Sequence, residues 1–170
     1  MCEDNCYEKK MLSPRICYIP GPTGPKGEPG TSPVSVFGRK FDDSVQNINL
    51  LPDTSLAIPL SNNGESSLIN IDIENNLTIT QDGNYKIDYF FSGISHENAN
   101  ITVEVRQNDE VINGTSIVRD TIADATTDFI GSTIVFLSAS DNISMSITST
   151  STVTISPVIG TNAYLNIYKL

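Results

Sequence analysis

The chain has 170 residues, of which 38% are apolar and 18% charged, and it carries a formal net charge of −10. This composition supplies enough apolar material for one hydrophobic core and excludes a disordered chain. The acidic balance argues against nucleic acid or an anionic membrane as a partner, since both need a basic surface. No apolar run approaches the roughly 18 residues that cross a bilayer. The N-terminus, MCEDNCYEKKML, lacks the apolar region of a signal peptide, so we expect no signal peptide.

The first 20 residues form an N-terminal leader that contains every cysteine of the chain. The spacing of the thiols does not match the close pairs that are typical of zinc sites. Because their number is odd, at least one thiol per chain has no partner within the chain, which predicts disulfides between chains in an oxidising location. The alternative is three reduced thiols without a role. The cysteines are Cys2, Cys6 and Cys17.

The leader also contains a small apolar cluster. Its members are too few to form a core of their own, so we expect them to dock onto another protein, either a further copy of this chain or a different protein. The docking residues are Met11, Leu12, Ile16, Tyr18 and Ile19.

Residues 21–32 form a collagen-like segment that begins GPTGPKGEPG. Glycine at every third position is the requirement of the collagen triple helix, in which only glycine fits at the axis, and proline favours the polyproline II backbone. Three triplets cannot hold a triple helix alone, so another part of the chain would have to bring three copies together. The alternative is a stiff extended spacer. The glycines in register are Gly21, Gly24, Gly27 and Gly30.

Residues 33–170 contain many short segments rich in β-branched and aromatic residues, separated by Asn, Asp, Gly and Ser. No long window has helical periodicity. About ten strands predict an all-β, two-sheet sandwich such as a jelly roll. We expect strands at 34–37, 55–60, 68–73, 77–80, 85–91, 101–105, 134–137, 143–148, 152–155 and 163–170, with turns at 62–64, 81–83 and 108–110.

Two of these segments, YKIDYFF at 85–91 and AYLNIYKL at 163–170, carry apolar side chains on both faces. A strand that is apolar on both faces must be covered twice. The second cover is either a loop or another subunit, and we favour a subunit because the collagen-like segment needs three copies. The predicted trimer interface consists of Tyr85, Tyr89, Phe90, Tyr164, Tyr168 and Leu170.

Four features, in their order along residues 21–170, resemble the BclA-like exosporium proteins of the bacterial spore surface, within the C1q/TNF-like superfamily. They are the GPTGPKGEPG run, DGNYKIDY at 82–89, LSASDNISM at 137–145 and the ending AYLNIYKL. The resemblance implies a homotrimer of C1q/TNF-like jelly rolls, in which each N-terminus leaves near the threefold axis. The domain order also resembles that of subunits of thin endospore appendages, in which N-terminal connectors join trimers into fibres.

The chain departs from the BclA-like pattern at several points. Ser140 stands where the family often has glycine, and only Thr23 matches the family's usual glycosylated position. The collagen-like segment is short, and the leader with its cysteines differs from the usual exosporium-targeting leader. These departures put a sugar-coated layer in doubt and leave the details of the turn at Ser140 open.

These features together predict a structural protein on the external face of the bacterial spore, in the exosporium or an appendage. It would trimerise through residues 33–170 and assemble or anchor through its leader, into filaments locked by disulfides. Its expected partners are further copies of itself and spore coat or exosporium proteins. The alternative is a C1q-like module that binds a ligand or a host surface.

We expect no enzyme, no cofactor and no metal. Asp120, Asp124 and Asp128 could offer oxygen ligands to Ca²⁺, but the stretch lacks the glycine and glutamate of an EF-hand, and we expect a solvated loop. A Ser-His-Asp site would have to use His96, the only histidine, and no nucleophile motif accompanies it.

Overall fold

The computed structural model describes residues 24, 35–71 and 75–170. The leader and the collagen-like segment, apart from Gly24, lie outside these residues, so the predictions made for them stay predictions. In the part of the chain that the structure describes, the regular secondary structure is β-strand. No helix there is long and apolar enough to cross a membrane.

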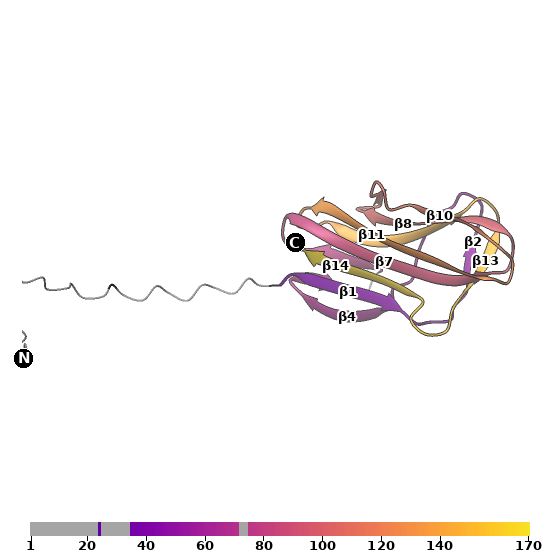
Figure 1. The fold of residues 1–170 in the computed structure, drawn as a ribbon, viewed down its shortest axis with the longest axis horizontal. Coiled ribbons are helices and arrows are strands. Elements are labelled where there is room, and N and C mark those ends of the chain that lie inside the picture. The colour runs from indigo at the N-terminus through magenta and orange to yellow at the C-terminus, as the bar shows by residue number, and fades with distance from the viewer. Residues whose placement is uncertain (1–23, 25–34, 72–74) are drawn as a thin grey trace, which may run out of the picture. The chain divides into compact units, whose positions relative to one another are not determined.

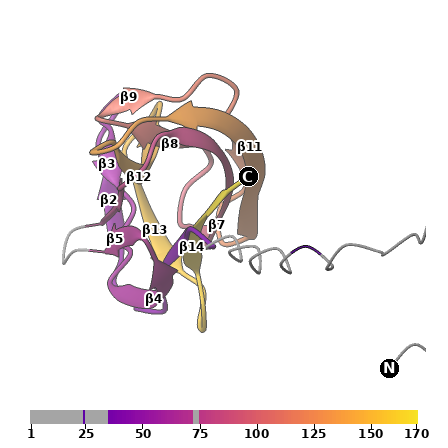
Figure 2. The same ribbon diagram turned by 90° about the vertical axis from the view of Figure 1, so that its left-hand side faces the viewer.

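The strands form two antiparallel sheets that pack face to face as a sandwich (Figures 1 and 2). In sheet A the order is β2-β13-β7-β14-β1-β4, and β11 pairs with the free side of β7; in sheet B the order is β10-β8-β12-β6-β5, with β3 on β12 and β9 on β8. Sheet A contains β1 (Phe37–Asp42), β2 (Ile48–Leu50), β4 (Asn62–Ser67), β7 (Gly83–Ser95), β11 (Thr126–Leu137), β13 (Val153–Pro157) and β14 (Ala163–Lys169). Sheet B contains β3 (Leu56–Ala57), β5 (Ile69–Ile71), β6 (Asn76–Ile79), β8 (Ala99–Gln107), β9 (Glu110–Val111), β10 (Ile117–Thr121) and β12 (Asn142–Ser149).

The chain crosses between the sheets repeatedly: β7 lies in sheet A, β8 and β10 in sheet B, β11 in sheet A, β12 in sheet B and β14 in sheet A. Neighbours within a sheet are therefore often distant in sequence, as in β1 and β14. This arrangement of two sheets with crossing connections is a jelly roll, and it confirms the predicted all-β sandwich.

The core lies between the sheets and is built by alternation along each strand. On β7 the side chains at 85, 87, 89 and 91 point inward and are buried, while the intervening residues point outward. Inward residues of β8 and β12, such as Val103, Met145 and Ile147, complete the layer and are fully buried. Burying one such side chain contributes roughly 1.5–3 kcal/mol, so this regular alternation holds the two sheets together.

Several sequence predictions about the ends and turns of strands were wrong. The strand expected at 34–37 begins at Phe37 and continues to Asp42, and the strand expected at 134–137 is only the end of β11. The expected turn at 62–64 is the first half of β4, because its backbone pairs with β1 and this pairing outweighs the local turn preference. The stretch 120–128, expected as a solvated loop, is instead the end of β10, a tight turn and the start of β11. The expected turns at 81–83 and 108–110 are confirmed, and Asn108 and Asp109 have the positive φ of a hairpin turn.

The LSASDNISM segment contains a turn at Ser138–Asp141, in which Ser140 and Asp141 each have a structural role. Ser140 adopts a φ of 77°, in the left-handed region that favours glycine. The Asp141 carboxylate accepts hydrogen bonds from the Ser138 backbone N–H at 2.8 Å and from the side chains of Gln107 and Asn108. Burial of this carboxyl raises its pKa, but the three hydrogen bonds outweigh burial and place the pKa of Asp141 below its usual value. Asp141 therefore ties the β8–β9 turn to the β11–β12 turn.

Gly131 makes room for Tyr89, one of the two buried tyrosines of the core. It lies directly opposite Tyr89 in the β11–β7 ladder, and a Cβ atom at Gly131 would lie 2.1 Å from Cζ of the Tyr89 ring. The Tyr89 hydroxyl donates a hydrogen bond to the carbonyl of Thr115, so the ring cannot swing aside without losing that bond.

We therefore predict that Gly131→Ala lowers the free energy of unfolding by about 1–3 kcal/mol through overpacking, although alanine ordinarily suits a strand better than glycine. Urea denaturation measures this effect. In a Tyr89→Leu background the ring is absent, so the same Gly131→Ala change is expected to be neutral or stabilising. An equal loss in both backgrounds would show that Tyr89 is not the obstacle.

Candidate functional site

The outward side of β11, β7, β14 and β1, called here the outer face of sheet A, exposes an unusual amount of apolar surface. Ile130, Ile134 and Phe136 on β11 are each more than half exposed, and Tyr168 and Leu170 lie exposed at the end of the chain. Single exposed apolar residues are common, whereas a contiguous apolar patch typically marks a contact surface.

The strand registers arrange this face in three rows. The first apolar row runs across the four strands as Ile130, Phe90, Tyr164 and Phe41, and the rings of Phe90 and Tyr164 stack at 5.3 Å between centroids. The second apolar row is Ile134, Lys86, Tyr168 and Phe37, in which Lys86 is the one polar member. Between them lies the polar row, Ser132, Asp88, Asn166 and Arg39.

One half of the polar row is satisfied within the chain. The Asp88 carboxylate accepts hydrogen bonds from Ser132 Oγ at 2.6 Å and from Lys86 Nζ at 2.9 Å. Burial raises the pKa of Asp88, but the bonds from Ser132 and Lys86 outweigh it, so the pKa of Asp88 lies below its usual value. The hydrogen bond to Asp88 raises the pKa of Lys86, which stays charged.

The other half of the polar row is incomplete. Within the described residues, Asn166 Oδ1 is buried and has no hydrogen-bond partner. A buried acceptor without a donor costs roughly 1–3 kcal/mol. The guanidinium carbon of Arg39 lies 5.2 Å from the ring centre of Phe41 and 5.9 Å from that of Tyr164, and the ion pairs found in the described part of the chain do not include Arg39. Among the described residues, the face therefore carries one buried acceptor without a donor and one exposed cation without an ion-pair partner.

The structure separates the six residues predicted for the trimer interface. Phe90, Tyr164 and Tyr168 lie on the outer face of sheet A, and Leu170 follows at its end. Tyr85 and Tyr89 are only 0% and 2% exposed within a single chain and belong to its core. Strand alternation is the reason: they stand at odd positions of β7 and face sheet B. They cannot contact a neighbour across this face, and we remove them from the interface.

Sequence reasoning missed the apolar residues that β11 and β1 add to this face: Ile130, Ile134, Phe136, Phe37 and Phe41. The alternation at 130–136 was the available signal, because every second residue there is apolar or small. What the local sequence could not reveal is that β11 lies beside β7 and β1 beside β14, since both pairs are distant along the chain.

The three aspartates considered for calcium have separate partners. Asp120 accepts a hydrogen bond from Asn100, Asp124 lies beside His96 and Asp128 accepts one from Ser92. Within the described residues no three His, Cys, Asp or Glu side chains converge as they would around a metal ion.

His96 does contact a serine and an aspartate. Its Nδ1 lies 3.2 Å from Asp124 Oδ1 and its Nε2 lies 2.8 Å from Ser156 Oγ. Ser156 Oγ donates its hydrogen to Asn47 Oδ1 at 3.0 Å. These contacts join the segments that carry His96, Asp124, Ser156 and Asn47.

Comparison with solved structures shows that the domain has the fold of TNF and C1q globular domains. It is similar to Eiger TNF from S. frugiperda, with a TM-score of 0.61, 10% identity, and coverage of 80% of this chain and 92% of that one. It is also similar to the globular domain of zebrafish complement 1qA protein, with a TM-score of 0.57, 8% identity, and coverage of 81% and 98%. At such identities these likenesses show the fold alone.

The sequence itself gives the family. Residues 41–170 match the sequence model described as the BclA C-terminal domain. This match covers most of the chain, so the chain belongs to the family of proteins with a BclA C-terminal domain, as the resemblance in its motifs predicted. A search of curated proteins finds no match.

The polar row generates a prediction about acid stability. A carboxyl group whose pKa is lowered by folding stabilises the folded state above its unfolded pKa, and this contribution is lost as the pH falls through the folded pKa. We expect Asp88→Asn to flatten the fall in the free energy of unfolding below about pH 4, measured by urea denaturation at a series of pH values. Asp53→Asn, at an exposed loop position outside the polar row, controls for the removal of one negative charge. An acid limb identical to that of the unmodified protein would contradict the role given to Asp88.

Proposed function

We propose that this chain is a structural protein of the bacterial spore surface, whose C-terminal domain forms a homotrimer through the outer face of sheet A. Membership in the BclA C-terminal domain family supports the location, because the relatives that the chain resembles are exosporium proteins. The observation that carries the trimer is the pair of apolar rows that frame an incomplete polar row on one side of the sandwich.

The apolar rows provide the free energy of association in this proposal. Transferring one exposed aliphatic side chain such as Ile130 or Ile134 from water into an interface contributes roughly 1.5–3 kcal/mol. A closed ring of three copies uses a heterologous contact, in which this face of one copy meets a different surface of the next. The same face is then covered in every copy.

The polar row fixes how the copies meet. A neighbour that supplies a donor to Asn166 Oδ1 removes the cost of that unsatisfied acceptor, and an acceptor on the neighbour pairs the exposed Arg39. A neighbour in another register leaves Asn166 Oδ1 without a donor and buries Arg39 without a partner. Buried polar groups of this kind contribute less to affinity than to the choice of a single arrangement. In this proposal the apolar rows hold the trimer together and the polar row sets its register.

Trimerisation also gives the N-terminal segments a purpose. Three collagen-like segments that start from one trimer are held at a high effective concentration, which compensates for their shortness. They align three leaders, whose cysteines form disulfides between chains and whose apolar residues dock onto another copy or onto a coat or exosporium protein. The resulting assembly is a filament or a surface layer on the spore.

A charge placed in the second apolar row tests this function. We predict that Ile134→Lys weakens trimerisation at least about 100-fold, because an unpaired ammonium group would have to be buried. Sedimentation velocity of the full chain in reducing buffer measures the mass. Val118→Lys is the charge-matched comparison, since Val118 is an exposed valine on β10 of sheet B and lies outside the outer face of sheet A. An Ile134→Lys protein with the mass of the unmodified one would refute the proposal.

A further inference from the structure

Two asparagine–glycine pairs occur in the sequence, at Asn63–Gly64 and at Asn113–Gly114. Such a pair can modify itself without an enzyme, because the backbone nitrogen of the glycine can attack the amide carbon of the asparagine side chain, and glycine has no side chain to hinder the approach. The attack requires the backbone to leave its folded conformation, so the surroundings of each pair decide whether it reacts. The structure places the two pairs in opposite surroundings.

Asn63–Gly64 lies within strand β4. Asn63 stands opposite Lys40 in the β1–β4 ladder, and a Cβ atom at Gly64 would lie 3.0 Å from the Arg39 side chain. Ring closure between Asn63 and Gly64 would require β4 to separate from β1 and from Arg39. We therefore expect the folded domain to protect this pair.

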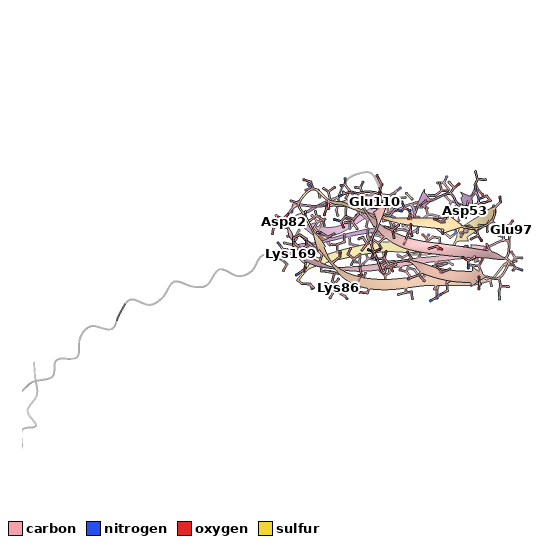
Figure 3. All side chains as sticks on the ribbon, turned by 90° about the horizontal axis from the view of Figure 1, so that it is seen from above. Asp53, Asp82, Lys86, Glu97, Glu110 and Lys169 are labelled. Carbon is pink, nitrogen blue, oxygen red and sulfur yellow. The ribbon has the colours of Figure 1, made fainter. Side chains whose placement is uncertain are left out.

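Asn113–Gly114 forms the tip of the turn between β9 and β10. The Thr115 backbone N–H donates to the carbonyl of Ile112 at 3.2 Å, and Gly114 has a φ of 84°, in the left-handed region that favours glycine. Asn113 and Gly114 are exposed, and among the described residues only chain neighbours lie within 4 Å of where a Cβ atom of Gly114 would stand. Figure 3 shows Glu110, a β9 residue that precedes the turn, at the surface of the domain. The tip is therefore open to water and can change its backbone without displacing other residues.

The two ends of this turn, in contrast, are anchored in the core. Ile112 and Thr115 are buried. The Thr115 hydroxyl accepts a hydrogen bond from the Val105 backbone N–H at 3.1 Å, and the Thr115 carbonyl accepts one from the Tyr89 hydroxyl. A change in the length of the turn therefore reaches Tyr89 through a single residue, Thr115.

We propose that Asn113 is a self-modification site. The Gly114 nitrogen bonds to Cγ of Asn113 while the Cγ–Nδ2 bond breaks, the amide proton of Gly114 leaves with the amino group as ammonia, and a cyclic imide remains. Water then opens one of the two carbonyl bonds of the imide, which gives either aspartate or isoaspartate. Both products add one negative charge, but only isoaspartate lengthens the backbone, by one methylene group. This inference goes beyond the proposed function and does not depend on the trimer.

The two products differ in their effect on the core. Isoaspartate at position 113 shifts Thr115 relative to Ile112, so the hydrogen bond between the Thr115 carbonyl and the Tyr89 hydroxyl weakens. Aspartate keeps the length of the turn and leaves this bond in place. The modification thus has one product that loosens the packing around Tyr89 and one that changes only the surface charge.

Ageing of the full chain at mildly alkaline pH, followed by mass spectrometry of its peptides, locates the reaction. In the folded chain, conversion is expected at least about tenfold faster at Asn113 than at Asn63. In urea both pairs are free of the fold and should react alike, which provides the reference. Asn113→Gln is the matched block, because glutamine would have to close a larger ring, and position 113 should then stay unconverted. Equal rates at Asn113 and Asn63 in the folded chain would overturn the inference.

Urea denaturation of the aged chain measures the effect on the core. Chains that carry isoaspartate, separated by chromatography, are expected to have an unfolded-to-folded ratio at least about fivefold that of the fresh chain. Asn113→Asp has the same added charge and should unfold like the fresh chain. In a Tyr89→Phe background the hydroxyl is absent, so isoaspartate should raise the ratio less. Isoaspartate chains as stable as Asn113→Asp would refute the link between the turn and Tyr89.

Discussion

Strand β7 and its neighbours have to be covered on both sides, and the rest of the account depends on this constraint. On the inner side, Tyr85 and Tyr89 fill the space between the sheets. On the outer side, Phe90 and its neighbours on β11 and β14 form apolar rows that a single chain leaves in water. The inner side is satisfied when one copy folds. No element among residues 35–71 and 75–170 covers the outer side, and the proposed trimer would supply that cover.

The domain separates its tasks by location. The outer face of sheet A carries apolar rows and an unfilled acceptor at Asn166, a chemistry suited to a permanent and register-specific contact. The outward side of sheet B has a different chemistry: there the Arg106 guanidinium pairs with Glu104 and donates a hydrogen bond to Ser146.

The fold was largely predictable because most strands bury one face, and burial leaves a period of two in the sequence, as in 101–105 and 143–148. The polar strands β4 and β10 escaped prediction, since their strand conformation comes from backbone pairing with β1 and β8 rather than from their own side chains. The same limit applies to the candidate site. Tyr164, Tyr168 and Phe90 could be identified as apolar residues on a second face, but Phe41 and Ile130 join them only through registers between strands far apart in the chain.

The native mass of the unmodified full chain in dilute, reducing buffer tests the central claim most directly. Covering of the outer face of sheet A by sister copies predicts a particle whose mass is a multiple of about 55 kDa, three times the chain mass of 18.4 kDa. The reductant breaks the disulfides proposed for the leader, so a trimer that remains is held by the domain. A single species of 18.4 kDa would contradict the account, because the apolar rows would then be stable in water without a partner.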